Sequence, residues 1–189
     1  MARAYSLSTS WLHWLSAPAI VGAIGTVVYA QTLTGEANKA QRGSVMFLHK
    51  SLGTTAALLL VPRLAAAVLT RRPPPLAGSS ELERAVAVPV HTALYSFSAV
   101  MAASGVYMGL AGGNGLPLFF GTIPAWAQRD ADGAKAAYDL HKLVGSWGKW
   151  LVAAHTAAAL GHYARGHAIF QRINPLLRGG GGGGGSVGA

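Results

Sequence analysis

Histidine is the residue type that recurs in this sequence at spacings suited to binding a metal or a cofactor. His141 and His155 lie 14 residues apart in one apolar stretch. At about 100° per residue, this separation leaves the two side chains within roughly 40° of each other on one face of a helix, and about 21 Å apart along it. One helix could therefore offer a ligand to each of two stacked cofactors, one near each edge of a membrane. Other segments would have to supply the partner ligands.

The elements that would position these histidines are four apolar stretches of about 20 residues, each long enough to cross a hydrocarbon core of roughly 30 Å. They cover residues 10–33, 47–70, 88–110 and 141–163. Only 11% of the residues are charged, against about a quarter in soluble domains. We therefore expect an all-α integral membrane protein, a bundle of four transmembrane helices formed by residues 1–178. Residues 179–189 are rich in glycine, and we expect them to be a disordered tail.

Basic residues indicate the orientation of this bundle. The N-terminus, the second connector and the C-terminal tail would share one side, and they carry Arg3, Arg71, Arg72, Arg84, Arg165, Arg172 and Arg178. The other two connectors carry four basic residues that are offset by four acidic ones. Because cytoplasmic loops hold the excess of Lys and Arg, both termini are predicted to lie on the cytoplasmic side. The net charge of +9 is then a property of basic loops, and no nucleic-acid partner is expected.

The alternating direction of the four helices places the histidines at two depths. His13 and His155 would lie near the inner edge of the membrane, and His49 and His141 near the outer edge. The simplest pairing gives two bis-histidine sites, His13/His155 and His49/His141, stacked across the membrane. Small residues stand four positions after each of these histidines, on the same helix face: Ala17, Gly53, Gly145 and Ala159. A flat porphyrin needs such room against the helix that binds it.

His91 also lies at the inner depth, but the position four residues later holds the bulky Tyr95. We therefore leave His91 out of the iron ligands. Ordinary hydrogen bonding between helices is the alternative for each histidine taken alone, and zinc or copper ligation is another. Two separated histidine pairs without carboxylates or thiolates suit haem better. The absence of cysteine excludes disulfides, cysteine-ligated iron–sulfur clusters and a covalent c-type haem.

Further candidate cofactor-binding residues surround these pairs. Lys50 and Lys142 adjoin the outer ligands and could balance haem propionates, or could extend to the lipid headgroups. Arg63 lies 14 residues after His49, at the inner depth, where it could pair with an inner propionate. His91 could bind a quinone or a propionate, or could be an ordinary interfacial histidine.

At these residues the sequence resembles the bacterial-type cytochrome b561 family, and particularly its small superoxide:ubiquinone oxidoreductase members. The matching parts are Leu12-His13-Trp14, Phe47-Leu48-His49 with Gly53, Arg63-Leu64, His91 with Tyr95, and the stretch from His141 through His155 to Tyr163. The resemblance covers residues 5–175. It implies a four-helix membrane cytochrome with two b-type haems, and ligands that map onto His13, His49, His141 and His155.

Bis-histidine haem has no open iron site, so shuttling of single electrons is the expected role. The resemblance implies superoxide, or another one-electron donor, on the outer side and ubiquinone as acceptor, in a bacterial or mitochondrial inner membrane. A redox protein or a second copy of the chain could be a partner. Two alternatives stay open: a haem-binding anchor subunit of a larger dehydrogenase or hydrogenase, and a haem-free membrane scaffold or transporter.

Overall fold

The computed structural model describes residues 4–176, most of which lie in four long helices. The elements in chain order are α1 (Leu7–Thr32), η1 (Glu36–Asn38), α2 (Lys39–Leu69), α3 (Glu81–Ala111), β1 (Leu116–Leu118), β2 (Gly121–Ile123), α4 (Ala131–Ala164) and α5 (Ile169–Ile173). The glycine-rich stretch 179–189, together with Arg3 and Arg178, lies outside the described residues.

Local sequence signals account for where the long helices begin. The Ser6 hydroxyl accepts a hydrogen bond from the Thr9 amide at the start of α1. Ser80 and Glu83 form a reciprocal capping box at the start of α3, and the Asp130 carboxylate caps α4. Such caps satisfy amide groups that have no partner within the helix.

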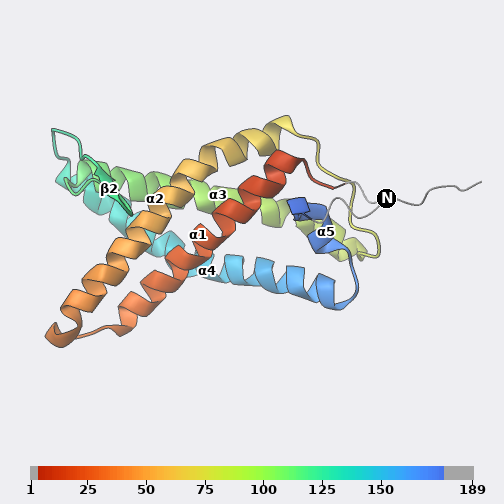
Figure 1. The fold of residues 1–189 in the computed structure, drawn as a ribbon, viewed down its shortest axis with the longest axis horizontal. Coiled ribbons are helices and arrows are strands. Elements are labelled where there is room, and N and C mark those ends of the chain that lie inside the picture. Colours follow the sequence, from red (N-terminus) through yellow and green to blue (C-terminus); the bar gives the residue numbers. More distant parts are fainter. Residues whose placement is uncertain (1–3, 177–189) are drawn as a thin grey trace, which may run out of the picture.

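Two antiparallel helix pairs form the body of the molecule (Figure 1). α1 packs along α2 and α3 packs along α4, and the first pair crosses the second at an angle. The β1–β2 hairpin packs against α2, and α5 lies at the opposite end of the bundle, near the start of α1. The four histidine-bearing helices therefore meet where the two pairs cross.

Both ends of the described chain lie at the same end of the bundle. The Tyr5 amide donates to the Arg172 carbonyl over 3.0 Å, and the Trp14 indole N–H donates to the Ile173 carbonyl over 3.2 Å. This geometry is what an even number of long helices requires.

Among residues 4–176, three helical segments are long and apolar enough to cross a membrane: Leu7–Thr32, Glu36–Leu69 and Glu81–Ala111. α4 has 34 residues, enough for a length of about 51 Å, but Lys149 and His155 lower the hydropathy of its apolar part. Large apolar side chains such as Val68 and Leu82 point outward along these helices, as in proteins whose surroundings are lipid.

The structure departs from the sequence prediction in the helix starts and in the third connector. α2, α3 and α4 begin at Lys39, Glu81 and Ala131, seven to ten residues before the predicted apolar segments. The third connector, between α3 and α4, contains the antiparallel β1–β2 hairpin, in which Leu116 pairs with Ile123, so the fold is not purely α-helical. Positive-φ glycines on the approach to the hairpin, Gly113 and Gly115, supply backbone turns that apolar periodicity does not reveal.

Two histidine pairs as a candidate cofactor site

The pair predicted to lie near the outer edge of the membrane, His49 and His141, is called the outer pair below and joins α2 to α4. The ring centres of His49 and His141 lie 6.3 Å apart, with their planes at 87°. Each histidine lies ten residues after the first residue of its helix, so the two rings meet at the same depth of the bundle. The sequence prediction placed these two histidines at one depth, and the structure brings them together.

Hydrogen bonds fix which nitrogen of each outer ring is protonated. The Nδ1 atom of His49 lies 2.9 Å from the Ala23 carbonyl oxygen, which can only accept. The Nδ1 atom of His141 lies 3.0 Å from the Ser104 hydroxyl, and that hydroxyl donates its own proton to the Val100 carbonyl. Both Nδ1 atoms therefore carry the proton. In a neutral ring this leaves the lone pair on Nε2, the state that binds a metal ion.

The inner cluster holds three histidines from three helices. The ring centre of His155 on α4 lies 6.5 Å from that of His13 on α1 and 5.6 Å from that of His91 on α3. The predicted pair His13/His155 is thus brought together, and His91 joins it. The Nδ1 atom of His91 lies 2.6 Å from the Ala87 carbonyl oxygen, so His91 also carries its proton on Nδ1.

Arg63 of α2 reaches this inner cluster, as its depth predicted. Its guanidinium donates to the buried Ser16 hydroxyl, lies 5.5 Å from the ring centre of Tyr95 and has Nη2 3.1 Å from the Nδ1 atom of His13. Because a guanidinium only donates, Nδ1 of His13 accepts here and Nε2 carries the proton. This tautomer cannot bind a metal ion through Nε2 until Arg63 moves away from Nδ1.

Ring spacing separates the possible pairs. Two imidazoles that bind one metal ion from opposite sides, with metal–nitrogen distances of about 2.0–2.1 Å, place their ring centres about 6.4 Å apart. The pairs His49/His141 and His13/His155 match this spacing, whereas His91/His155 are closer. Within residues 4–176 no group of three or more His, Cys, Asp or Glu side chains is arranged to hold a metal ion. The donor set therefore fits two axially ligated cofactors better than a zinc or copper site with three protein ligands.

The small residues beside the histidines differ in what they face. A methyl group added at Gly53 would meet no atom within 4 Å, whereas one at Gly145 would approach the Met101 side chain to 3.2 Å. Gly105 of α3 lies against the His141 ring, 3.3 Å from an added methyl group. Gly53 thus leaves space beside its histidine, while Gly145 and Gly105 allow α3 and α4 to approach each other.

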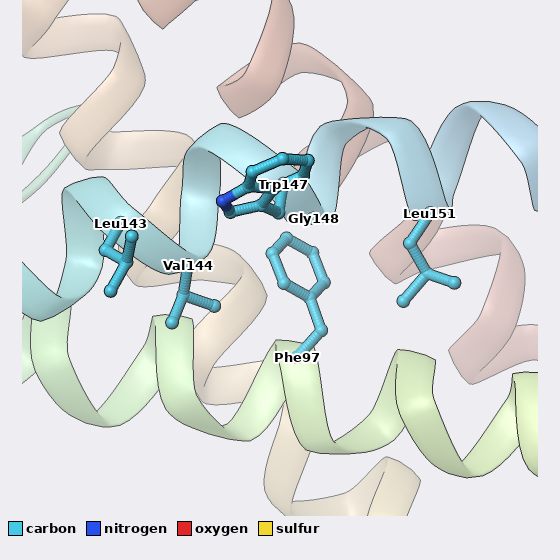
Figure 2. A pocket seen from close by; sticks show the side chains of 6 residues that line it. All are labelled: Phe97, Leu143, Val144, Trp147, Gly148 and Leu151. Carbon is cyan, nitrogen blue, oxygen red and sulfur yellow. The ribbon is translucent and has the colours of Figure 1, made fainter.

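Phe97 of α3 and Gly148 of α4 lie between the outer and inner clusters. The Phe97 ring points at α4 beneath Gly148 (Figure 2), and an added methyl group at Gly148 would overlap this ring. Both residues are buried. They belong to an open apolar groove of about 320 Å³ that Leu143, Val144, Trp147 and Leu151 also line. This contact sets the separation of α3 and α4 at the level between the two histidine pairs.

Lys50 and Lys142 follow the outer histidines directly and are exposed. The ion pairs formed within residues 4–176 include neither of them. Their role toward a propionate or a headgroup is not tested by this geometry and stays a prediction.

Sequence reasoning missed the partners of the histidine rings and a second polar cluster. Ser104, Ser16 and the Ala23 carbonyl carry no sequence signal, because their roles depend on how the helices cross. At the start of α3, Arg165 donates to Glu83 over 2.6 Å, and the Nδ1 atoms of His162 and His167 lie 2.9 Å apart. These two histidines tie the end of α4 to the following loop, away from the paired histidines.

Comparison with known families gives a match whose range includes these residues. The model of a family described as prokaryotic cytochrome b561 matches residues 4–174, which include both histidine pairs, Arg63 and His91. A search of curated proteins gives no match.

Proposed function

The chain belongs to the prokaryotic cytochrome b561 family, and from this premise we propose that it carries single electrons between the two faces of a membrane through two b-type haems, one at each histidine pair. Membership makes the protein a helical integral membrane protein that binds b-type haem and transfers electrons across the membrane. The number of haems, the ligands and the redox partners belong to our proposal. The observation that supports it most is the spacing of the two ring pairs, 6.3 and 6.5 Å.

Haem held by two histidines supplies reversible one-electron oxidation and reduction at an iron without an open position. The chain's own contribution is to hold the four rings. Nδ1 protons of His49 and His141, donated to Ala23 and Ser104, fix the tautomer and the rotation of the outer rings. We propose His13 and His155 as the inner ligands and α4 as the fourth membrane crossing, because α4 bears a histidine of each pair.

Arg63 has a second part in this proposal. If Nε2 of His13 were to hold the haem iron, its Nδ1 would carry the proton, and the Arg63 guanidinium would have to leave Nδ1. Arg63 then becomes available to pair with a carboxylate, which the propionate of an inner haem provides. His13 ligation and propionate binding by Arg63 would therefore occur together.

We propose superoxide, or another small one-electron donor, as the reductant on the outer side and ubiquinone as the oxidant. Two superoxide ions would each lose one electron and leave as dioxygen, and one ubiquinone would take up two electrons and two protons to become ubiquinol. Exposed Lys50 and Lys142 would attract an anionic donor to the outer pair. Exposed His91, at the inner cluster, would exchange protons with the quinone through Nε2.

A reduced-minus-oxidised visible spectrum of the purified protein, with haem content by pyridine haemochrome, tests the central proposal. We expect two b-type haems per chain, and one haem per chain after either His49→Ala or His13→Ala. His91→Ala should retain two. If His91→Ala loses the inner haem while His13→Ala keeps it, the inner pair is His91/His155 and our assignment is wrong.

The outer donor is tested by charge reversal. The double variant Lys50→Glu and Lys142→Glu should slow haem reduction by superoxide at low ionic strength, and added salt should shrink the difference. The matched control is Arg71→Glu with Arg72→Glu, which makes the same charge change in the second connector. Equal rates in the two double variants would exclude steering by the outer lysines. Co-purification with a metalloenzyme would instead favour an anchor-subunit role.

A further inference from the structure

A second concave site lies on the outer end of the bundle, beside the start of α4. It is a cavity of about 560 Å³, open to solvent, lined by Tyr107, Trp126, Gln128, Arg129 and Asp130. Its volume falls in the range of about 300–1,000 Å³ that small-molecule sites occupy. This cavity is separate from the histidine pairs: Tyr107 lies three residues after Ser104, about one helical turn farther toward the outer end.

One wall of the cavity is aromatic and fixed in place. The rings of Tyr107 and Trp126 meet edge to face, with centres 5.5 Å apart. The Trp126 amide donates to the Leu110 carbonyl over 3.1 Å, which anchors the loop to the end of α3. Trp126 is nevertheless 48% exposed, so part of its ring is available to a ligand.

Some polar groups of the cavity already have hydrogen-bond partners within the protein and are called occupied, whereas the others are available to a ligand. Asp130 is occupied: one carboxylate oxygen accepts from the Tyr107 hydroxyl over 2.6 Å and the other from the Gly133 amide over 2.9 Å. These two donors hold the pKa of the Asp130 carboxyl below its usual range, so it is ionised and already compensated.

The available groups are nearly all donors. The guanidinium of Arg129 lies against the backbone at Gly113, a glycine with φ +82°, and no ion pair formed within the described part of the chain includes it. The side-chain N–H groups of Trp126 and Gln128 likewise make no hydrogen bond within residues 4–176. A ligand that satisfies this set must bring oxygen acceptors, and an arginine favours a carboxylate or another planar anion.

We propose that this cavity is a binding site for a small, soluble organic anion with one ring, whose carboxylate pairs with Arg129 and whose ring packs on Trp126. Aromatic stacking and a charge-assisted hydrogen bond are independent contributions, so both the ring and the charge should be needed. Binding here does not depend on the haem assignment, because no histidine contributes to the cavity.

The test uses benzoate as probe and the haem-loaded protein in zwitterionic phosphatidylcholine nanodiscs, with binding measured by calorimetry and by tryptophan fluorescence. We expect saturable binding of benzoate, weaker binding of neutral benzamide and weaker binding of ringless acetate. Arg129→Gln should weaken benzoate binding about tenfold or more. Gln128→Glu should also weaken it, because the new carboxylate repels the probe, while haem content stays unchanged in both variants.

Lys135→Gln is the matched control, because Lys135 is an exposed cation six residues after Arg129 that pairs with Asp139 outside the cavity. The benzoate affinity of this variant should equal that of the original protein. Phosphatidylglycerol in the nanodiscs should leave benzoate affinity unchanged. Loss of benzoate binding in that lipid would identify a headgroup site and overturn the proposal. Absence of saturable binding, or equal affinities in Arg129→Gln and the original protein, would overturn it too.

Discussion

At the scale of single residues, the protonation of each ring nitrogen says more about metal binding than the position of the histidine does. The sequence alone predicted the pairs His49/His141 and His13/His155, because the direction of each apolar segment determines the depth of its histidines in the membrane. The proton positions could not be predicted, since they depend on Ala23, Ser104 and Arg63 from neighbouring helices. The outer rings present Nε2 lone pairs, whereas His13 does so only after Arg63 moves. If each pair holds an iron as proposed, the two pairs would therefore differ in how much they must rearrange to bind it.

A substitution of Ser104 tests whether the hydrogen bond to the His141 ring supports the proposed haem ligand. Ser104→Ala removes an acceptor for the Nδ1 proton of His141, so the ring is held less firmly and the outer haem should bind less tightly. Losing such a supporting hydrogen bond costs about 10–100-fold in metal affinity. The rate of haem transfer to apomyoglobin should show one faster phase, for the outer haem.

Ser98→Ala is the matched control for Ser104→Ala. Ser98 lies on the same helix and donates to the carbonyl four residues before it, as Ser104 does, but no hydrogen bond joins it to a histidine ring within residues 4–176. Haem release from Ser98→Ala should equal that of the original protein. Equal release from both serine variants would mean that the Ser104 contact does not support the haem ligand.

At the scale of elements, the Phe97 ring packs against Gly148 so closely that no methyl group fits between α3 and α4 there. Gly148→Ala would force the buried Phe97 ring out of its position, and overpacking of this kind costs about 1–3 kcal/mol. We expect a lower melting temperature in nanodiscs, followed by circular dichroism. Adding Phe97→Leu should restore part of the loss, because the smaller side chain leaves room for the new methyl group.

Gly161→Ala is the matched control for Gly148→Ala, because both glycines lie on α4. A methyl group there would meet nothing within 4 Å, and alanine is favoured over glycine in a helix by up to about 1 kcal/mol. The melting temperature should stay equal or rise. If Gly148→Ala behaves like Gly161→Ala, the Phe97 contact does not limit the approach of α3 and α4.

α4 and the β1–β2 hairpin show why the sequence predicts some elements less well than others. Lys149 is half-buried in the apolar part of α4, with its ammonium 5.5 Å from the ring centre of Trp150. A cation–π contact of this kind offsets part of the cost of a charge at that depth, and hydropathy does not record it. The hairpin was missed because its turn uses Phe119 at φ 47°, a conformation that no periodic pattern signals.

At the scale of the whole molecule, long apolar segments were enough to predict the number and direction of the helices. The crossing of the two helix pairs was not predictable, because it depends on individual contacts between the pairs, such as Arg63 with Tyr95 and His49 with His141. The same-side position of the two ends follows from the structure. Which side of the membrane they face rests on the distribution of Lys and Arg alone.

That orientation can be measured because the chain has no cysteine. Single alanine-to-cysteine changes at exposed connector positions, made at Ala37, Ala77 and Ala127, would each carry one thiol for a membrane-impermeant maleimide. If positively charged connectors stay in the cytoplasm, Ala37→Cys and Ala127→Cys should be labelled in intact bacterial cells whose outer membrane has been permeabilised. Ala77→Cys should react only after the inner membrane is broken.

The opposite labelling pattern would change the proposed electron path as well as the topology. Lys50, Lys142 and the Arg129 cavity lie on the Ala37 and Ala127 side of the bundle, so they would then face the cytoplasm and could not collect an external anionic donor. Labelling of Ala37→Cys without Ala127→Cys would place the two connectors on different sides, which means that one of the two helices between them, α2 or α3, does not cross the membrane. The three labelling results together therefore decide whether α2 and α3 both cross the membrane and on which side electrons would enter.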